Sequence, residues 1–227
     1  MYFIWFLIYE MVYIISAEIS QELKWEHWGT CIGLVMYICF FLGWLSWTGK
    51  RDEIALRCYK VEDIKSISYF IPFLALPFYN YMLADTSVID SSWVLLMLCV
   101  VSVEEIFFRG VLYGLLSEWS KVGYIVVSSV IFALFHLMNF GEGADWLYVE
   151  MQAIAALGMG IACSAMVVYG NSIYPCIILH FLVNISSGCG IKYEMNSLHS
   201  VETYGLVFCV FIYIFFGIVI YRKSERK

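Results

Sequence analysis

Three ionisable residues, Glu104, Glu105 and Arg109, lie within six positions of an otherwise strongly apolar segment, SVEEIFFRGVLYGLL. An ionised side chain at the centre of a bilayer costs about 2.5 to 3.5 kcal/mol on insertion scales, and such residues usually face a protein interior or a wet cavity. Glu105 and Arg109 are four residues apart with the acid first, which is the favourable order for an ion pair on one helix face. Glu104 lies about 100° around the same helix. It therefore needs another partner, such as water, a proton, a metal ion or a histidine.

Two later apolar segments each carry a histidine. His136, in SSVIFALFHLMNF, follows Phe132 on the same helix face, and His180, in YPCIILHFLVNIS, is followed four residues later by Asn184. Either histidine alone is more often a hydrogen-bonded interior residue than a catalytic one. If three helices buried these polar groups separately, each would meet the cost of desolvation, whereas convergence lets them satisfy one another. We therefore predict that the three segments meet.

Glutamate, two histidines and asparagine suit hydrolysis. A glutamate can deprotonate a water, or two imidazoles can hold a metal ion that activates the water. An asparagine amide can donate a hydrogen bond to a developing oxyanion, a contact commonly worth a few kcal/mol in the transition state. The combination predicts hydrolysis of an amide bond within the membrane.

The composition is that of a membrane protein. Of the 227 residues, 62% are hydrophobic and 14% are charged, which lies outside the usual balance of a soluble domain. The net charge of -6, with no basic patch beyond one short loop and the C-terminal tail, argues against a nucleic-acid partner. The eight cysteines include no CxxC pair. We expect them to be small buried apolar residues, neither disulfide-bonded nor zinc ligands.

We predict an all-α fold, a polytopic transmembrane helix bundle of about eight spans around a buried active-site cavity. A spanning helix needs roughly 20 apolar residues, and the apolar runs place the spans near 1–17, 28–47, 67–84, 92–117, 122–140, 147–169, 171–188 and 203–221. Pro72 and Pro77 predict a kink or break in the third span. Residues 1–227 are expected to form a single integral membrane domain, with a motif-bearing catalytic core at 92–188.

The distribution of basic residues predicts the orientation, because Lys and Arg are retained on the cytoplasmic side during insertion. With eight spans and the N-terminus inside, the outer segments hold Lys24 and Lys192. The inner segments hold Lys50, Arg51, Arg57, Lys60, Lys65, Lys121, Arg222, Lys223, Arg226 and Lys227. We therefore expect a multi-pass cell-membrane protein with both termini in the cytoplasm and a cytoplasmic amphipathic loop at 48–66.

Three motifs carry a family resemblance: EEIFFRG at 104–110, FALFH at 132–136 and HFLVN at 180–184. In order, spacing and helix context they resemble the signature motifs of the CAAX protease and bacteriocin-processing family of intramembrane endopeptidases.

The resemblance extends over about residues 92–188 and implies roles for individual residues. Glu104 would be the water-activating base, and His136 and His180 would flank that water or a metal. The other catalytic residue would be Asn184, as oxyanion donor. The supporting residues would be Glu105, Arg109 and Phe132.

The dependence on a metal is open at this point. Glu104, His136 and His180 could fill the first shell of Zn²⁺ and leave one open position, yet they do not form an HExxH helix. We favour glutamate catalysis without a metal. The expected partners are membrane lipid and a peptide or protein substrate, prenylated or not. A prenylated CaaX substrate would imply a eukaryotic setting, whereas a short chain with minimal loops is more typical of a bacterial member.

Two other functions compete with proteolysis. A non-catalytic bacteriocin self-immunity protein or membrane scaffold could bind a peptide in the same cavity. A proton-coupled transporter could use glutamate and histidine as a relay, but it predicts inverted repeats with broken helices in both halves. A proline-interrupted span occurs in the first half alone.

Overall fold

The computed structural model describes residues 2–56, 68–83, 90–142, 146–188 and 201–226. These residues form helices and no strand, in agreement with the predicted all-α fold. The longer helices are α1 (Tyr2–Glu22), α2 (Trp28–Trp47), α5 (Ser91–Glu105), α7 (Lys121–His136), α8 (Trp146–Gly170), α9 (Tyr174–Gly188) and α10 (Val201–Ser224). The shorter ones are η1 (Arg51–Ile54), η2 (Ile71–Leu74), α4 (Ala75–Leu83), η4 (Ile106–Val111), α6 (Leu112–Leu116) and η5 (Leu137–Glu142).

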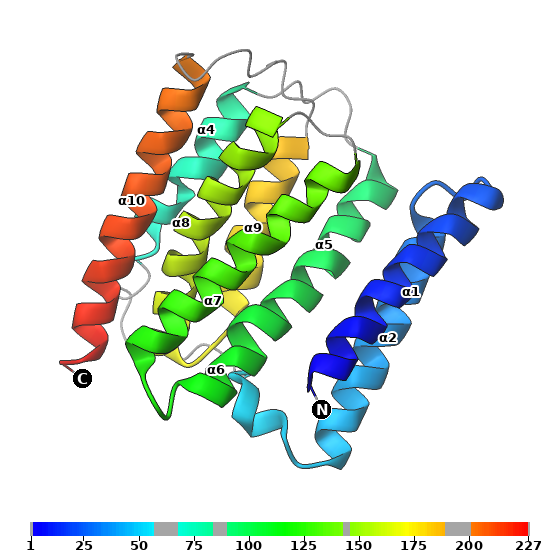
Figure 1. Cartoon of the computed structure of the whole chain (residues 1–227), viewed down its shortest axis with the longest axis horizontal. Helices are drawn as coiled ribbons and strands as arrows, with labels where there is room; N and C mark the ends of the chain where they lie inside the picture. The colour runs from blue at the N-terminus through cyan, green and yellow to red at the C-terminus, as the bar shows by residue number, and fades with distance from the viewer. Residues whose placement is uncertain (1, 57–67, 84–89, 143–145, 189–200, 227) are drawn as a thin grey trace.

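The helices run alongside one another in a single bundle (Figure 1). Helix α8 packs against α7 and α10, and α9 packs against α4 and α5. Helices α1 and α2 form a hairpin at one side, where α2 contacts α5. Both termini lie at the same end of the bundle (Figure 1).

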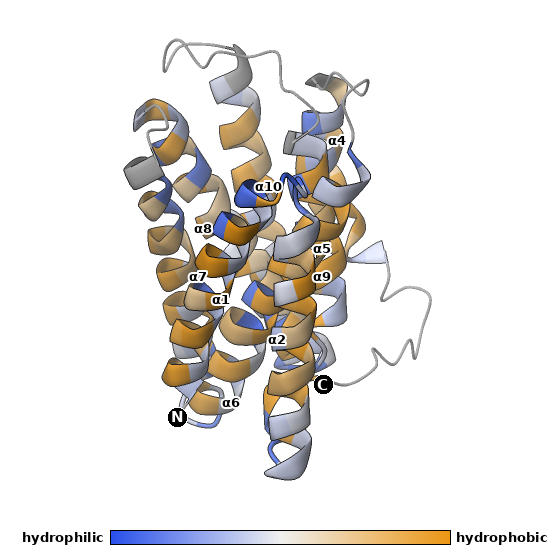
Figure 2. Ribbon diagram, turned by 90° about the vertical axis from the view of Figure 1, so that its right-hand side faces the viewer, coloured by the Kyte–Doolittle hydropathy of each residue, from blue (hydrophilic) through white to orange (hydrophobic). Residues whose placement is uncertain are grey.

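Among the described residues, five helical segments are long and apolar enough to cross a membrane: α1, α2, Lys121–Asn139, α8 and Thr203–Ser224. Helix α9 is apolar but shorter, and α5 continues into η4 and α6 past three charged residues. Each of the eight predicted spans contains a helix, and length and composition support five of them as spans. Most of the helix ribbons in Figure 2 are orange or tan, the colours of hydrophobic residues. The protein is therefore a multi-pass membrane protein.

The predicted break in the third span is confirmed. The segment begins as the 3₁₀ helix η2, which contains Pro72, and continues as α4, which has Pro77 in its first turn. A proline is tolerated in a first turn because the N–H that it lacks would have no partner within the helix. The hydroxyl of Tyr213 on α10 donates to the backbone carbonyl of Phe73 at 2.6 Å, so the break is anchored from a second helix.

The predicted cytoplasmic loop at 48–66 is described up to Leu56, and its residues 57–66 lie outside the described part. Ile54 and Ala55 are buried, at 0% and 1% exposure. The backbone carbonyl of Ala55 accepts a hydrogen bond from the N–H of Ile173 at 3.2 Å. The first part of this loop therefore packs into the bundle.

Helix α5, which carries the two glutamates, begins at a well-formed cap. The side chain of Asp90 accepts from the backbone N–H groups of Ser92 and Trp93, at 3.3 and 3.2 Å, as an N-cap residue typically does. The Ser92 hydroxyl also donates to this carboxylate. That bond, followed by the backbone bonds, holds the pKa of Asp90 below its usual range.

The described cysteines are Cys31, Cys39, Cys99, Cys163, Cys176 and Cys209, and all are free thiols. Five are buried, as predicted, while Cys39 is exposed on the outer face of α2. Cys58 and Cys189 lie outside the described residues.

Substitution of Gly160 is expected to loosen the contact between α7 and α8. A Cβ at this position would lie 2.8 Å from the Cα of Ser129, so Gly160→Ala should lower the free energy of unfolding by about 1 to 3 kcal/mol. Gly43 is a matched control on α2, because a Cβ there meets no heavy atom within 4 Å. Gly43→Ala should be neutral or stabilise by up to about 1 kcal/mol. Thermal unfolding in detergent measures both, and equal shifts in Tm would contradict the packing argument.

Candidate active site

His180 is the residue that joins the motifs. It lies on α9, which packs against α5, and it is 1% exposed. Its Nδ1 lies 2.8 Å from Oε1 of Glu105, while its Nε2 lies 3.6 Å from Oε2 of Glu104. The imidazole therefore contacts both neighbouring glutamates, one with each ring nitrogen.

Glu105 is shared between His180 and Arg109. Its Oε2 lies 3.4 Å from Nε of Arg109, and both side chains are fully buried, so the predicted ion pair is present. The guanidinium carbon lies 3.9 Å from the ring centroid of Phe132, a cation–π contact that further compensates the buried charge. Glu105 thus holds the imidazole of His180 with one oxygen and faces the guanidinium with the other.

A π-helix carries Arg109, a feature that the sequence analysis missed. It is η4, and it follows the glutamates directly. Such segments disturb the usual backbone bonding and recur at functional sites. Two hydroxyls of α7 donate to its carbonyls: Tyr124 to Arg109 at 3.1 Å and Ser128 to Phe108 at 2.6 Å. Tyr124 and Ser128, four residues apart in an apolar helix, were the signal in the sequence.

His136 is the last residue of α7 and has a different environment from His180. Its Nδ1 lies 2.9 Å from the backbone carbonyl of Phe132. With Nδ1–H as the donor, Nε2 carries the free lone pair. The Phe132 ring contacts both imidazoles, at centroid distances of 4.6 Å to His136 and 5.4 Å to His180. In the described part of the chain, the ion pairs of the two glutamates involve His180 and Arg109, not His136.

His136 and Asn184 share a cavity of about 110 Å³. Its walls come from α4, α7, α8, α9 and α10, and its lining is Leu76, Asn80, His136, Tyr148, Gln152, Ala155, Ala156, Met159, Val183, Asn184, Ser187 and Leu206. The volume is large enough for several waters, and the polar lining offers them partners. The structure therefore groups the predicted catalytic residues as Glu104 with His180, and His136 with Asn184 beside a cavity.

The donors Glu104, His136 and His180 are of types that suit Zn²⁺, and each imidazole has its Nδ1 beside an acceptor, as metal-bound histidines usually do. Their ligand atoms do not all come within 4.8 Å of one another, however. Among the described residues, the one group that does is Glu105, Cys163 and Cys176. Arg109 lies against Glu105 there and opposes the binding of a cation. The observed arrangement therefore does not form a zinc first shell, and we derive no step through a metal.

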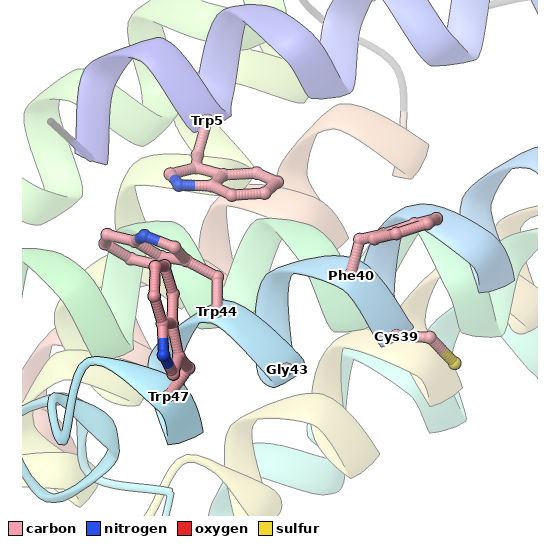
Figure 3. Close-up of a pocket in the computed structure, with 6 residues that line it drawn as sticks. All are labelled: Trp5, Cys39, Phe40, Gly43, Trp44 and Trp47. Carbon is pink, nitrogen blue, oxygen red and sulfur yellow. The ribbon is translucent and has the colours of Figure 1, made fainter.

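A larger hollow of about 450 Å³ lies on the hairpin of α1 and α2 (Figure 3). It is lined by Trp5, Cys39, Phe40, Gly43, Trp44 and Trp47. This lining contains no carboxylate, imidazole or amide side chain, and Trp5 of α1 faces Trp44 and Trp47 of α2 (Figure 3). The hollow offers apolar contact but no group for hydrolysis.

Residues 89–186 match the family model described as type II CAAX prenyl endopeptidase Rce1-like. The matched range contains all three motifs, and it confirms the predicted resemblance to the CAAX protease family. The match supports an intramembrane endopeptidase of the CAAX protease type. No curated protein and no solved structure matched the chain.

Proposed function

We propose that this chain, whose residues 89–186 match the Rce1-like family of type II CAAX prenyl endopeptidases, is an intramembrane endopeptidase in which Glu104 activates the attacking water. One observation carries the proposal: His180 contacts both Glu104 and Glu105, at 3.6 and 2.8 Å. Glu105 holds the ring in place, and the opposite nitrogen faces the catalytic carboxylate.

The attacking water is proposed to lie between Glu104 and His180. The separation of 3.6 Å between Oε2 of Glu104 and Nε2 of His180 is longer than a direct hydrogen bond, and a small outward movement of the Glu104 carboxylate admits a water between them. With Nδ1–H donating to Glu105, Nε2 accepts one proton of that water and Glu104 accepts the other. The lone pairs of the water oxygen then remain free to attack a carbonyl carbon.

The reaction follows from these positions. Glu104 removes a proton as the water oxygen bonds to the scissile carbon, and the carbonyl oxygen becomes an oxyanion. The amide of Asn184 donates to that oxyanion. Protonated Glu104 then delivers its proton to the leaving nitrogen as the C–N bond breaks. His136 lines the adjoining cavity, and the lone pair on its Nε2 can accept a hydrogen bond from a group that is bound there.

The substrate is proposed to be a membrane-associated peptide or protein, prenylated or unmodified. Lipid-facing helices support this, because large apolar side chains such as Phe40, Phe208 and Phe211 are exposed on the outside of the bundle. A substrate that is already in the bilayer would lie alongside these helices.

The test is cleavage of a peptide library by the protein purified in detergent. Defined products support the proposal, and binding of a peptide without any cleavage would favour the scaffold or immunity alternative. The same assay in the presence of a strong chelator distinguishes the two mechanisms. Full activity supports the metal-free mechanism, and loss of activity that Zn²⁺ restores would replace it by a zinc mechanism.

Both termini are proposed to lie in the cytoplasm. They share one end of the bundle (Figure 1), and Lys and Arg are retained on the cytoplasmic side. A cysteine in place of Lys223, in the last turn of α10, should react with a membrane-impermeant reagent only after permeabilisation. Labelling in intact cells would show that the true orientation is the opposite of the proposed one.

A further inference from the structure

Asn80 brings a side-chain amide to the cavity that contains His136 and Asn184. It lies in the middle of α4, is 7% exposed and lines the cavity. Its side chain makes no hydrogen bond with any described residue. Its amide is not among the described buried side-chain atoms that lack a partner, so it is open to the cavity, where a water or a ligand can bind to it.

Gln152 lines the same cavity from α8 and is oriented by a neighbour. Its Oε1 accepts a hydrogen bond from Nδ2 of Asn139 at 2.8 Å. This bond fixes the plane of the amide and leaves the two Nε2 protons as donors. Asn80 and Gln152 therefore bring polar groups to the cavity from α4 and α8.

The rest of the lining is uncharged. Apart from His136, the twelve residues include no basic or acidic side chain, and half of them are apolar. An amide presents both a donor and an acceptor, which matches the N–H and C=O groups of an extended peptide. The apolar walls suit an uncharged side chain.

We infer that Asn80 and Gln152 bind the main chain of the substrate next to the scissile bond, and that the cavity receives one uncharged side chain of that segment. The inference rests on the proposed endopeptidase function. It names two substrate-binding residues and a specificity: peptides with an acidic or basic residue at the subsite position are poor substrates.

The test uses internally quenched peptides that differ at one position beside the cleaved bond, with Ala, Leu, Asp or Lys. We expect Asn80→Ala and Gln152→Ala each to raise KM for the Ala and Leu peptides by about 3- to 10-fold, with kcat nearly unchanged. The Asp and Lys peptides should be cleaved at least about tenfold less efficiently by the wild type. The matched controls are Met82→Ala on α4 and Ile154→Ala on α8, which alter exposed residues.

A purely structural role for Asn80 predicts a lower Tm in Asn80→Ala, whereas loss of an amide that faces only the cavity should leave Tm nearly unchanged. An unchanged KM in both variants, or equal cleavage of all four peptides, would overturn the inference. If the wild type cleaves nothing, the proposed function fails, and fluorescence anisotropy of the labelled Leu peptide then decides the inference alone. Binding that Asn80→Ala weakens supports it, and binding that is unaffected or absent rejects it.

Discussion

Glu104→Gln is expected to lower kcat for peptide cleavage by about 10² to 10⁴-fold, the usual contribution of a general base. Glutamine keeps the size of the side chain but cannot take a proton from the water that we place beside His180. KM should change little, because the cavity that binds the peptide does not include Glu104. The measurement is steady-state cleavage of a library peptide by the variant in detergent.

Glu118→Gln is the matched control, since Glu118 is an exposed acid that follows α6. It should cleave like the wild type. Thermal unfolding of Glu104→Gln should remain cooperative, which separates loss of the base from loss of the fold. Cleavage by Glu104→Gln at the rate of the wild type would remove Glu104 from the mechanism.

Breaking the buried pair of Glu105 and Arg109 is expected to have the largest effect on stability. Both side chains are fully buried, so Glu105→Leu leaves an uncompensated guanidinium and should lower the free energy of unfolding by about 3 to 5 kcal/mol. Arg109→Met should lower the free energy of unfolding by less, because the Glu105 carboxylate still has His180 as a partner. The double variant should be more stable than the sum of the single changes predicts, since it removes both charges.

Measurements of activity separate the role of Glu105 in stability from its role in holding the imidazole of His180. The double variant regains stability but still lacks the acceptor that holds Nδ1 of His180, so its kcat should remain low. Lys50→Met is the control for an exposed pair, because Lys50 lies 3.8 Å from Glu53 at the surface. Lys50→Met should lower the free energy of unfolding by less than about 1 kcal/mol. A double variant with full activity would show that Glu105 does not position His180.

Local patterns were sufficient for the features that depend on neighbouring residues. The apolar runs predicted where helices form, the two prolines predicted the break before α4, and the spacing of Glu105 and Arg109 predicted their ion pair. Each of these is determined within one or two helical turns. The three motifs also predicted the family, because their residue types and order are properties of the chain itself.

The tertiary structure decided which motif residues touch. The periodicity of a helix shows which residues share a face, but not which face meets which neighbour. The sequence therefore left His136 and His180 equivalent, and only the packing of α9 against α5 gave His180 both glutamates and placed His136 beside a cavity. The sequence also did not show which carbonyls the hydroxyls of Tyr124 and Ser128 bond to, because the π-helix that carries Arg109 meets them only through the packing of α7. The sequence by itself determined the chemical groups and their helices, and the packing of distant helices determined their partners.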